Sequence, residues 1–203
     1  MLNLTSQQQH NCSAPINRAR QFGFTLAELL VVIAIVGILA TFAVPGIQGV
    51  LAEANLRQQT DALMTDMRYA RSMALRRGLS VNICASANPT DATPTCTTSN
   101  PNWATGWIIF IDNDNDNQFD STEELLRRQE DTSSDSGGID TGTGGSSGQP
   151  PSSFRFNREG RTTGLQSSFI FKSRTSQTEL DRAICLSTTG RIRVTNAGVT
   201  ACS

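Results

Sequence analysis

The first strong pattern along the chain is a long apolar run followed by a helical repeat of apolar positions. Residues 29–44 contain no charged side chain, and with its flanks the run has roughly the 20 residues that a helix needs to span a bilayer. Beyond this run, apolar side chains recur at the spacing of one helix face, at Leu56, Leu63, Met67, Ala70 and Ala74. Gly78 follows Arg76 and Arg77, as at a helix C-terminus. The pattern predicts one helix from Phe24 to about Arg77, with an apolar first half and an amphipathic second half.

After Gly78 the apolar period shortens to that of β-strands. Short apolar or alternating stretches predict strands at 79–86, 106–112, 124–129, 153–157, 168–173, 182–187 and 191–195. Residues 188–190, Thr-Thr-Gly, suit a hairpin turn between the last two strands. The Gly/Ser-rich stretch 132–151 predicts a flexible surface loop. A long N-terminal helix with a mainly antiparallel sheet is an α+β fold.

The net charge of −1 conceals an uneven distribution. Residues 110–140 carry a net charge of −8, whereas residues 150–203 carry +5. Such asymmetry indicates an anionic partner for the basic end. An ordinary solvated surface, with the two charged halves facing each other, explains the composition equally well.

The five cysteines include no CxxC pair, which argues against a zinc ribbon or a thioredoxin-like motif. Cys12 precedes the apolar run. Four cysteines after a membrane segment predict two disulfides in an oxidising compartment. The simplest of the three connectivities is local, Cys84 with Cys96 and Cys185 with Cys202, and buried free thiols are the alternative.

A glycine and an acid interrupt the start of the apolar run, in Gly23-Phe24-Thr25-Leu26-Ala27-Glu28-Leu29. This heptapeptide closely resembles the class III signal of type IV prepilins and pseudopilins. The resemblance implies cleavage by a prepilin peptidase after Gly23 and N-methylation of the new terminal Phe24. Residues 1–23 are then a leader, and residues 24–45 form the transmembrane and filament-core half of the helix. Glu28 becomes the fifth mature residue and Pro45 the twenty-second, as in the family pattern.

The carboxylate of Glu28 needs a partner, because a charge inside a membrane span costs about 2.5–3.5 kcal/mol on insertion scales. The resemblance implies that this partner is the N-terminal amine of a neighbouring subunit. A snorkelling acid near the interface of a plain membrane anchor is the alternative. Pro45 removes an intrahelical hydrogen bond and is expected to kink or open the helix locally, in the zone where pilins loosen during packing.

The rest of the chain is similar to the GspH/FimT family of minor pilins and pseudopilins. The resemblance is carried by "MTDMRYARSMALRRG" at residues 64–78, by the strand after it, and by "GWIIFIDNDNDNQFDSTEELLR" at residues 106–127. It implies a type IV pilin-like fold. The amphipathic half of the helix covers residues 46–78, and a β-rich domain covers residues 79–203. One branch of this family binds DNA in natural transformation, and another works at the tip of the type II secretion machine.

The segment Gly190-Arg191-Ile192-Arg193 is the strongest binding candidate. Alternate strand residues share a face, so both arginines are expected to project outward while Ile192 points inward. Guanidinium forks bind phosphates bidentately, and the tetrapeptide matches the GRxR motif of the DNA-binding FimT proteins. Lys172 and Arg174 are expected to extend the patch. Edge-strand charge that guards a sheet against aggregation is the alternative. With no base-reading constellation, binding is expected to tolerate any sequence.

Acids occupy positions 1, 3, 5, 9 and 12 of a twelve-residue stretch, as in a calcium-binding loop: Asp112, Asp114, Asp116, Asp120 and Glu123. Position 6, normally glycine, is Asn117. An Asp/Asn-rich hairpin turn is the alternative. Calcium is the one candidate cofactor, and the function is not expected to require it.

The only histidine, His10, falls in the predicted leader, which leaves the mature chain without an imidazole base. An enzyme is therefore not expected. The sequence predicts a minor type IV pilin that binds DNA for uptake in natural transformation. A structural pseudopilin of a type II secretion system, or a pilus-assembly primer without DNA affinity, is the alternative. The expected partners are DNA, other pilins, the prepilin peptidase and the inner membrane, with the globular domain in the periplasm before assembly into a filament.

Overall fold

The computed structural model describes residues 24–99, 101–130, 132, 137–142, 151–162, 167–174 and 177–202, without the side chains of residues 41–48, 141–142 and 167. The predicted leader with Gly23, and most of the predicted loop 132–151, lie outside the described residues. The chain divides into two compact units, Met1–Ala43 and Val44–Ser203.

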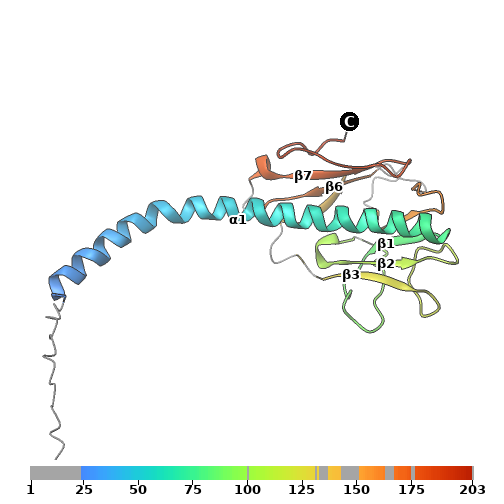
Figure 1. Cartoon of the computed structure of the whole chain (residues 1–203), viewed down its shortest axis with the longest axis horizontal. Helices are drawn as coiled ribbons and strands as arrows, with labels where there is room; N and C mark the ends of the chain where they lie inside the picture. Colours follow the sequence, from blue (N-terminus) through green and yellow to red (C-terminus); the bar gives the residue numbers. More distant parts are fainter. Residues whose placement is uncertain are drawn as a thin grey trace, which may run out of the picture. The chain divides into compact units, whose positions relative to one another are not determined.

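Helix α1 runs from Leu26 to Arg77, as the apolar pattern predicts (Figure 1). Thr25 caps its start, because its side-chain Oγ1 accepts a hydrogen bond from the backbone N–H of Glu28 at 3.2 Å. Gly78 ends it with a φ of +66°, and its N–H bonds the carbonyl of Ala74 at 2.9 Å. Pro45 lies within these helix bounds. Within the described part of the chain, no helix combines the length and apolar character that a bilayer crossing requires.

Among the described residues of the second unit, two antiparallel four-stranded sheets follow α1. The first has the order β3-β2-β1-β5 and the second β4-β6-β7-β8. The strands are β1 Val81–Ala85, β2 Trp107–Ile111, β3 Leu125–Gln129, β4 Ile139–Gly142, β5 Ser153–Phe156, β6 Ser167–Phe171, β7 Arg182–Leu186 and β8 Ile192–Val194. Two 3-10 turns, Trp103–Thr105 and Thr178–Leu180, precede β2 and β7. The α+β fold and its antiparallel sheets are as expected from the sequence.

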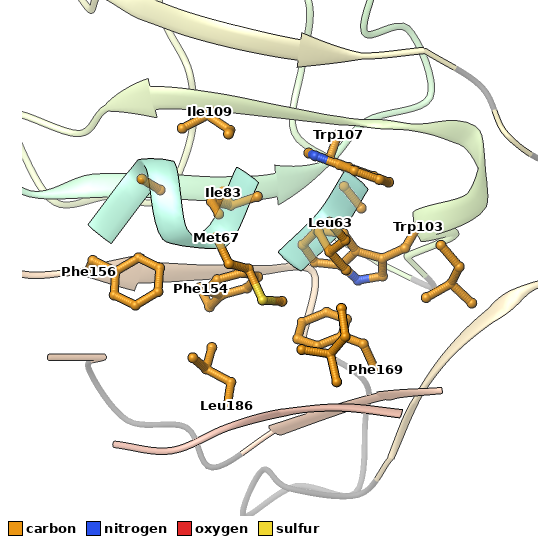
Figure 2. Packing of buried hydrophobic residues seen from close by; sticks show 14 of the residues in the cluster. Leu63, Met67, Ile83, Trp103, Trp107, Ile109, Phe154, Phe156, Phe169 and Leu186 are labelled. Atoms are coloured by element: carbon orange, nitrogen blue, oxygen red, sulfur yellow. The ribbon is translucent and has the colours of Figure 1, made fainter. Parts of the chain in front are cut away.

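The core lies between the second half of α1 and the two sheets. The predicted helical stripe is buried along its whole length, at Leu56, Leu63, Met67, Ala70 and Ala74. In Figure 2, Leu63 and Met67 of the helix lie among Trp107 of the first sheet and Phe169 of the second. Because one face of α1 packs against both sheets, this helix determines the positions of the sheet edges.

Polar contacts add a second tie between the helix and the first sheet. Buried Asp66 accepts a hydrogen bond from the indole Nε1 of Trp107 at 2.9 Å and another from Arg127 at 2.8 Å. The Arg127 guanidinium also lies 4.1 Å from the ring centre of Tyr69. Arg77 adds a bidentate pair with Glu124, at 2.6 and 3.0 Å.

Both disulfides have the local connectivity predicted from the sequence. Cys84 bonds Cys96, and Cys185 bonds Cys202. The second disulfide joins β7 to the C-terminal segment, which continues from β8.

One strand was not predicted. Residues 132–151 were expected to be a flexible surface loop, but β4 lies within them and pairs with β6. Ile139 is the buried apolar side chain that attaches β4 to the core. A single apolar residue in a Gly/Ser-rich stretch gives no periodicity, so only pairing with β6 defines this strand.

Candidate nucleic-acid interface

The turn between β7 and β8 holds the segment that the sequence singled out. Ser187 donates its backbone N–H to the carbonyl of Arg191 at 3.0 Å, and Gly190 donates to the carbonyl of Ser187 at 2.8 Å. The Ser187 hydroxyl accepts a further bond from the N–H of Arg191 at 3.2 Å. The backbone on both sides of Gly190 is therefore held by hydrogen bonds within the turn.

Gly190 is required in this turn for two reasons. Its φ of +75° is unfavourable for residues with a Cβ. A Cβ at this position would also lie 2.1 Å from the carbonyl oxygen of Gly160 and 3.0 Å from Nε of Arg71. The turn therefore packs directly against the 157–162 turn and helix α1, which a larger residue would prevent.

The side chains after Gly190 alternate as predicted. Arg191 and Arg193 are exposed, whereas Ile192 is partly buried and packs against the core. Arg193 is opposite Cys185, so it stands beside the disulfide that joins β7 to the C-terminal segment. Both arginine side chains therefore reach the protein surface.

Helix α1 contributes charges to the site that the sequence pattern did not predict there. Arg68, Arg71 and Ser72 line a shallow groove of about 330 Å³ together with Leu75, Arg191 and Ile192. Arg71 donates from Nη2 to the carbonyl of Thr189 at 3.2 Å, which ties the helix to the hairpin. The three-residue spacing of Arg68 and Arg71 places them on one helix face, but their nearness to Arg191 depends on the tertiary structure.

Lys172 and Arg174 do not join this group. Phe171 pairs with Arg182 at one end of β7, whereas Ile192 pairs with Leu186 at the other. The predicted extension is therefore wrong in position: Lys172 and Arg174 follow β6 at the end remote from Arg191, about 15 Å along the strands. Lys172 is also ion-paired with Asp140, and that hydrogen bond raises the pKa of the Lys172 ammonium.

The acidic turn between β2 and β3 brings three of the five predicted ligands together. Carboxylate oxygens of Asp112, Asp114 and Asp116 lie within 4.8 Å of one another. Asp120 is not in this group and accepts bonds from the N–H and hydroxyl of Thr122 at 2.6 Å. Glu123 is also outside it and accepts from the N–H of Asn113 at 2.9 Å. Burial raises the pKa of Glu123.

Two family profiles cover most of the chain. The prokaryotic N-terminal methylation motif matches residues 18–44. The profile described as Type II transport protein GspH matches residues 59–190, more than half of the chain. The chain belongs to the GspH family. The GspH match runs from the second half of α1 to Gly190 and therefore includes both the acidic turn and the start of the arginine-rich hairpin.

One solved structure of a minor pilin shares this fold. A crystal structure of the type IV minor pilin FimU from Pseudomonas aeruginosa strain PAO1 has 16% sequence identity and a TM-score of 0.50, over 72% of this chain and 92% of the FimU chain. A second FimU crystal form has 16% identity and a TM-score of 0.49, over 71% and 96% of the two chains. The first match confirms the predicted type IV pilin fold. Family and fold together are those of pilin-type structural proteins.

The methylation motif includes Gly23, Phe24 and Glu28, the residues predicted to act in processing and assembly. It implies a pilin that is processed at the membrane and assembled with other pilins. The cleavage residue Gly23 lies outside the described residues, and the expected new terminus, Phe24, is 84% exposed. Glu28 is exposed, and the apolar side chains from Leu29 to Leu39 are also exposed in the single chain.

Proposed function

We propose that this GspH-family pilin binds DNA through the sugar–phosphate backbone, in DNA uptake during natural transformation. The binding surface is the arginine patch, defined as Arg68 and Arg71 of α1 with Arg191 and Arg193 of the β7–β8 hairpin. The observation that carries the proposal is the groove that places Arg191 beside the two helix arginines.

The chemistry of the patch suits phosphates. Guanidinium groups present planar pairs of donors that match phosphate oxygens. Arg68, Arg191 and Arg193 are exposed, so their guanidinium groups reach the surface of the domain. Four phosphate contacts give a slope of about −3 to −4 in log affinity against log salt. The contacts are to the backbone, so affinity depends little on base sequence.

The patch is also held in shape before binding. The hydrogen bonds of the turn, the Cys185–Cys202 disulfide and the bond from Arg71 to Thr189 fix the hairpin against α1. A pre-ordered surface loses less conformational entropy on binding than a flexible arginine-rich tail. This supports a receptor role on the outside of a filament.

The membrane and assembly steps complete the proposal. The subunit is held in the inner membrane through residues 24–45 before assembly, with the globular domain in the periplasm. In the filament, the Glu28 carboxylate meets the amine of a neighbouring Phe24. The methylation motif at residues 18–44 supports this sequence of events.

The test measures DNA binding by the full chain in detergent micelles. Fluorescence anisotropy of the DNA is the readout, at several salt concentrations. The double variant Arg191→Gln plus Arg193→Gln is expected to bind at least tenfold more weakly at low salt. The matched control is Lys172→Gln plus Arg174→Gln, which removes the same charge at the other end of the sheet. Equal losses in both double variants would show that only net charge matters, and absence of binding at low salt would overturn the proposal.

The second candidate function is structural, as a pseudopilin of a type II secretion system. The description of the matching family, Type II transport protein GspH, favours it. Under this function, the arginine double variant assembles and supports secretion normally, and the full chain has no affinity for DNA. The same binding experiment therefore separates the two functions.

A further inference from the structure

The turn from β2 to β3 contains a buried carboxylate oxygen without a partner. Asp112 follows β2 directly and is 1% exposed. Its Oδ2 accepts hydrogen bonds from Arg155 at 3.2 Å and from Nδ2 of Asn82 at 3.3 Å. Its Oδ1 is buried and accepts none. A buried acceptor without a donor is costly, so this oxygen is a candidate ligand atom for a cation.

Two further buried oxygens in the same region also lack donors. The side-chain Oδ1 of Asn82 has no partner, although Asn82 is fully buried. Nδ2 of Asn82 donates to Asp112 and to Asn117, which leaves Oδ1 as the unmatched atom. Oε2 of Glu123 is likewise buried and unmatched. All three atoms are acceptors. Asp112 is the one of these residues that belongs to the group of neighbouring aspartates, so its Oδ1 is the candidate cation ligand.

Asp114 and Asp116 bring further negative charge to Asp112. One carboxylate oxygen from each of the three aspartates lies within 4.8 Å of the others. Like charges at this range repel one another by about 1 kcal/mol per pair in water, and by more where one of them is buried, as Asp112 is. Within the described residues, Arg155 is the base paired with Asp112. Asp114 and Asp116 are exposed, so a multivalent cation could approach the group from solvent and neutralise it.

The turn is already folded around its aspartates. Asp114 accepts a bond from the N–H of Asp116 at 3.2 Å, and Asp116 accepts one from the N–H of Gln118 at 2.6 Å. Asn115 and Asn117 have positive φ values of 65° and 66°, which asparagine tolerates better than most residues. Asn117 thus adopts the conformation that the sixth position of a calcium loop requires.

The donor set points to calcium. The group consists of carboxylate oxygens, without histidine or cysteine, which disfavours zinc. Mg²⁺ requires near-ideal octahedral geometry and gives up its waters reluctantly, whereas Ca²⁺ accepts irregular oxygen sets from a flexible loop.

We propose that the turn after β2 binds one Ca²⁺ through Asp112, Asp114 and Asp116. The ion neutralises the three carboxylates and locks the turn against β1 and β5, through Asn82 and Arg155. This site does not depend on the proposed DNA binding. With three carboxylates, we expect a dissociation constant of about 10⁻⁴–10⁻³ M, as in extracellular calcium modules.

The experiment is calcium titration of the full chain in detergent micelles after treatment with a chelator, by calorimetry and by thermal unfolding. The expected result is one Ca²⁺ per chain and a rise in Tm with calcium that equal Mg²⁺ does not reproduce. Asp114→Asn plus Asp116→Asn is expected to weaken binding at least tenfold. Both side chains are exposed, so this variant keeps the fold, whereas Asp112→Asn would also disturb the pair with Arg155.

The matched control is Asp61→Asn, which removes an exposed acid from α1. It is expected to bind calcium as the unchanged chain does. Absence of binding and of a Tm shift at 5 mM calcium (about five times the weakest affinity expected) would overturn the proposal. So would equal weakening by Asp61→Asn, or undiminished binding in the Asp114/Asp116 double variant.

Discussion

A Cβ on Gly190 would lie 2.1 Å from the carbonyl oxygen of Gly160. This close approach seats the β7–β8 hairpin against the 157–162 turn and against Arg71 of α1. It explains in steric terms why glycine comes directly before the two exposed arginines. The position of Arg191 therefore depends on a backbone contact, in addition to its own side-chain interactions.

Gly190→Ala is expected to destabilise the fold by about 1–3 kcal/mol from backbone strain, with a further cost because the hairpin must move. DNA affinity should fall as well, since Arg191 moves with the turn. Gly198→Ala is the matched control, because Gly198 has a similar φ of +78° but its nearest neighbouring atom lies 3.4 Å from the added Cβ. Denaturant unfolding and DNA anisotropy measure both effects. Equal stability losses in the two variants would contradict the steric argument.

Arg68→Gln is expected to weaken DNA binding and to reduce the salt slope by about 1, because one phosphate contact is lost. The comparison is Arg57→Gln, which removes a charge from the same helix outside the groove. Anisotropy titrations at three or more salt concentrations provide the slopes. If Arg57→Gln changes the slope as much as Arg68→Gln does, α1 acts as a diffuse charge and the groove is not the site.

Removing the Cys185–Cys202 disulfide with two serines should cost about 3 kcal/mol, from the loop of 17 residues that it closes. DNA affinity should also fall, because Arg193 is opposite Cys185. Removing Cys84–Cys96, which closes 12 residues, should destabilise the chain similarly and leave DNA affinity unchanged. Thermal unfolding and DNA titration of both variants make the comparison. If both disulfide variants bound DNA more weakly, the loss of affinity would come from general loosening of the fold and not from the position of Arg193.

Asp66→Ala is expected to cost about 2 kcal/mol, because the buried indole N–H of Trp107 loses its acceptor and Arg127 loses its pair. Asp61→Ala, at an exposed position on the same helix, should cost little. Tryptophan fluorescence during denaturant unfolding is a suitable probe, since Trp103 and Trp107 are both buried. If Asp61→Ala lost as much stability as Asp66→Ala, the loss would come from substituting the helix in general and not from the contacts of Asp66.

Glu159 directly precedes Gly160, whose carbonyl oxygen lies close to Gly190. The pKa of Glu159 is lowered, because Arg158 donates a 2.8 Å hydrogen bond to its carboxylate. A carboxylate with a folded pKa below its unfolded value adds stability above the unfolded pKa and loses it as pH falls through the folded pKa. NMR titration should therefore show Glu159 titrating below the ordinary glutamate range. Arg158→Gln should raise this pKa toward the ordinary value. An unchanged midpoint in the variant would exclude Arg158 as the cause.

The sequence predicted most of the elements because each has a local periodicity. The helix follows from an uncharged run and an apolar stripe, and most strands follow from alternation. The strand β4 was missed because Ile139 alone gives no period, and its pairing with β6 defines it. The expected position of Lys172 beside Arg191 was wrong. The predicted strand order already implied their separation, because successive turns between consecutive antiparallel strands lie at opposite ends of the sheet.

By itself, the sequence determined the pilin-type N-terminus, the exposed arginines of the hairpin and the run of aspartates, because each is a matter of residue type at short spacing. Only the tertiary structure decided which distant groups meet. It brought Arg68 and Arg71 to Arg191, separated by more than a hundred residues, and it left Asp112 buried beside Asn82 and Arg155. These juxtapositions depend on how one helix face packs against two sheets, and no local pattern encodes that packing.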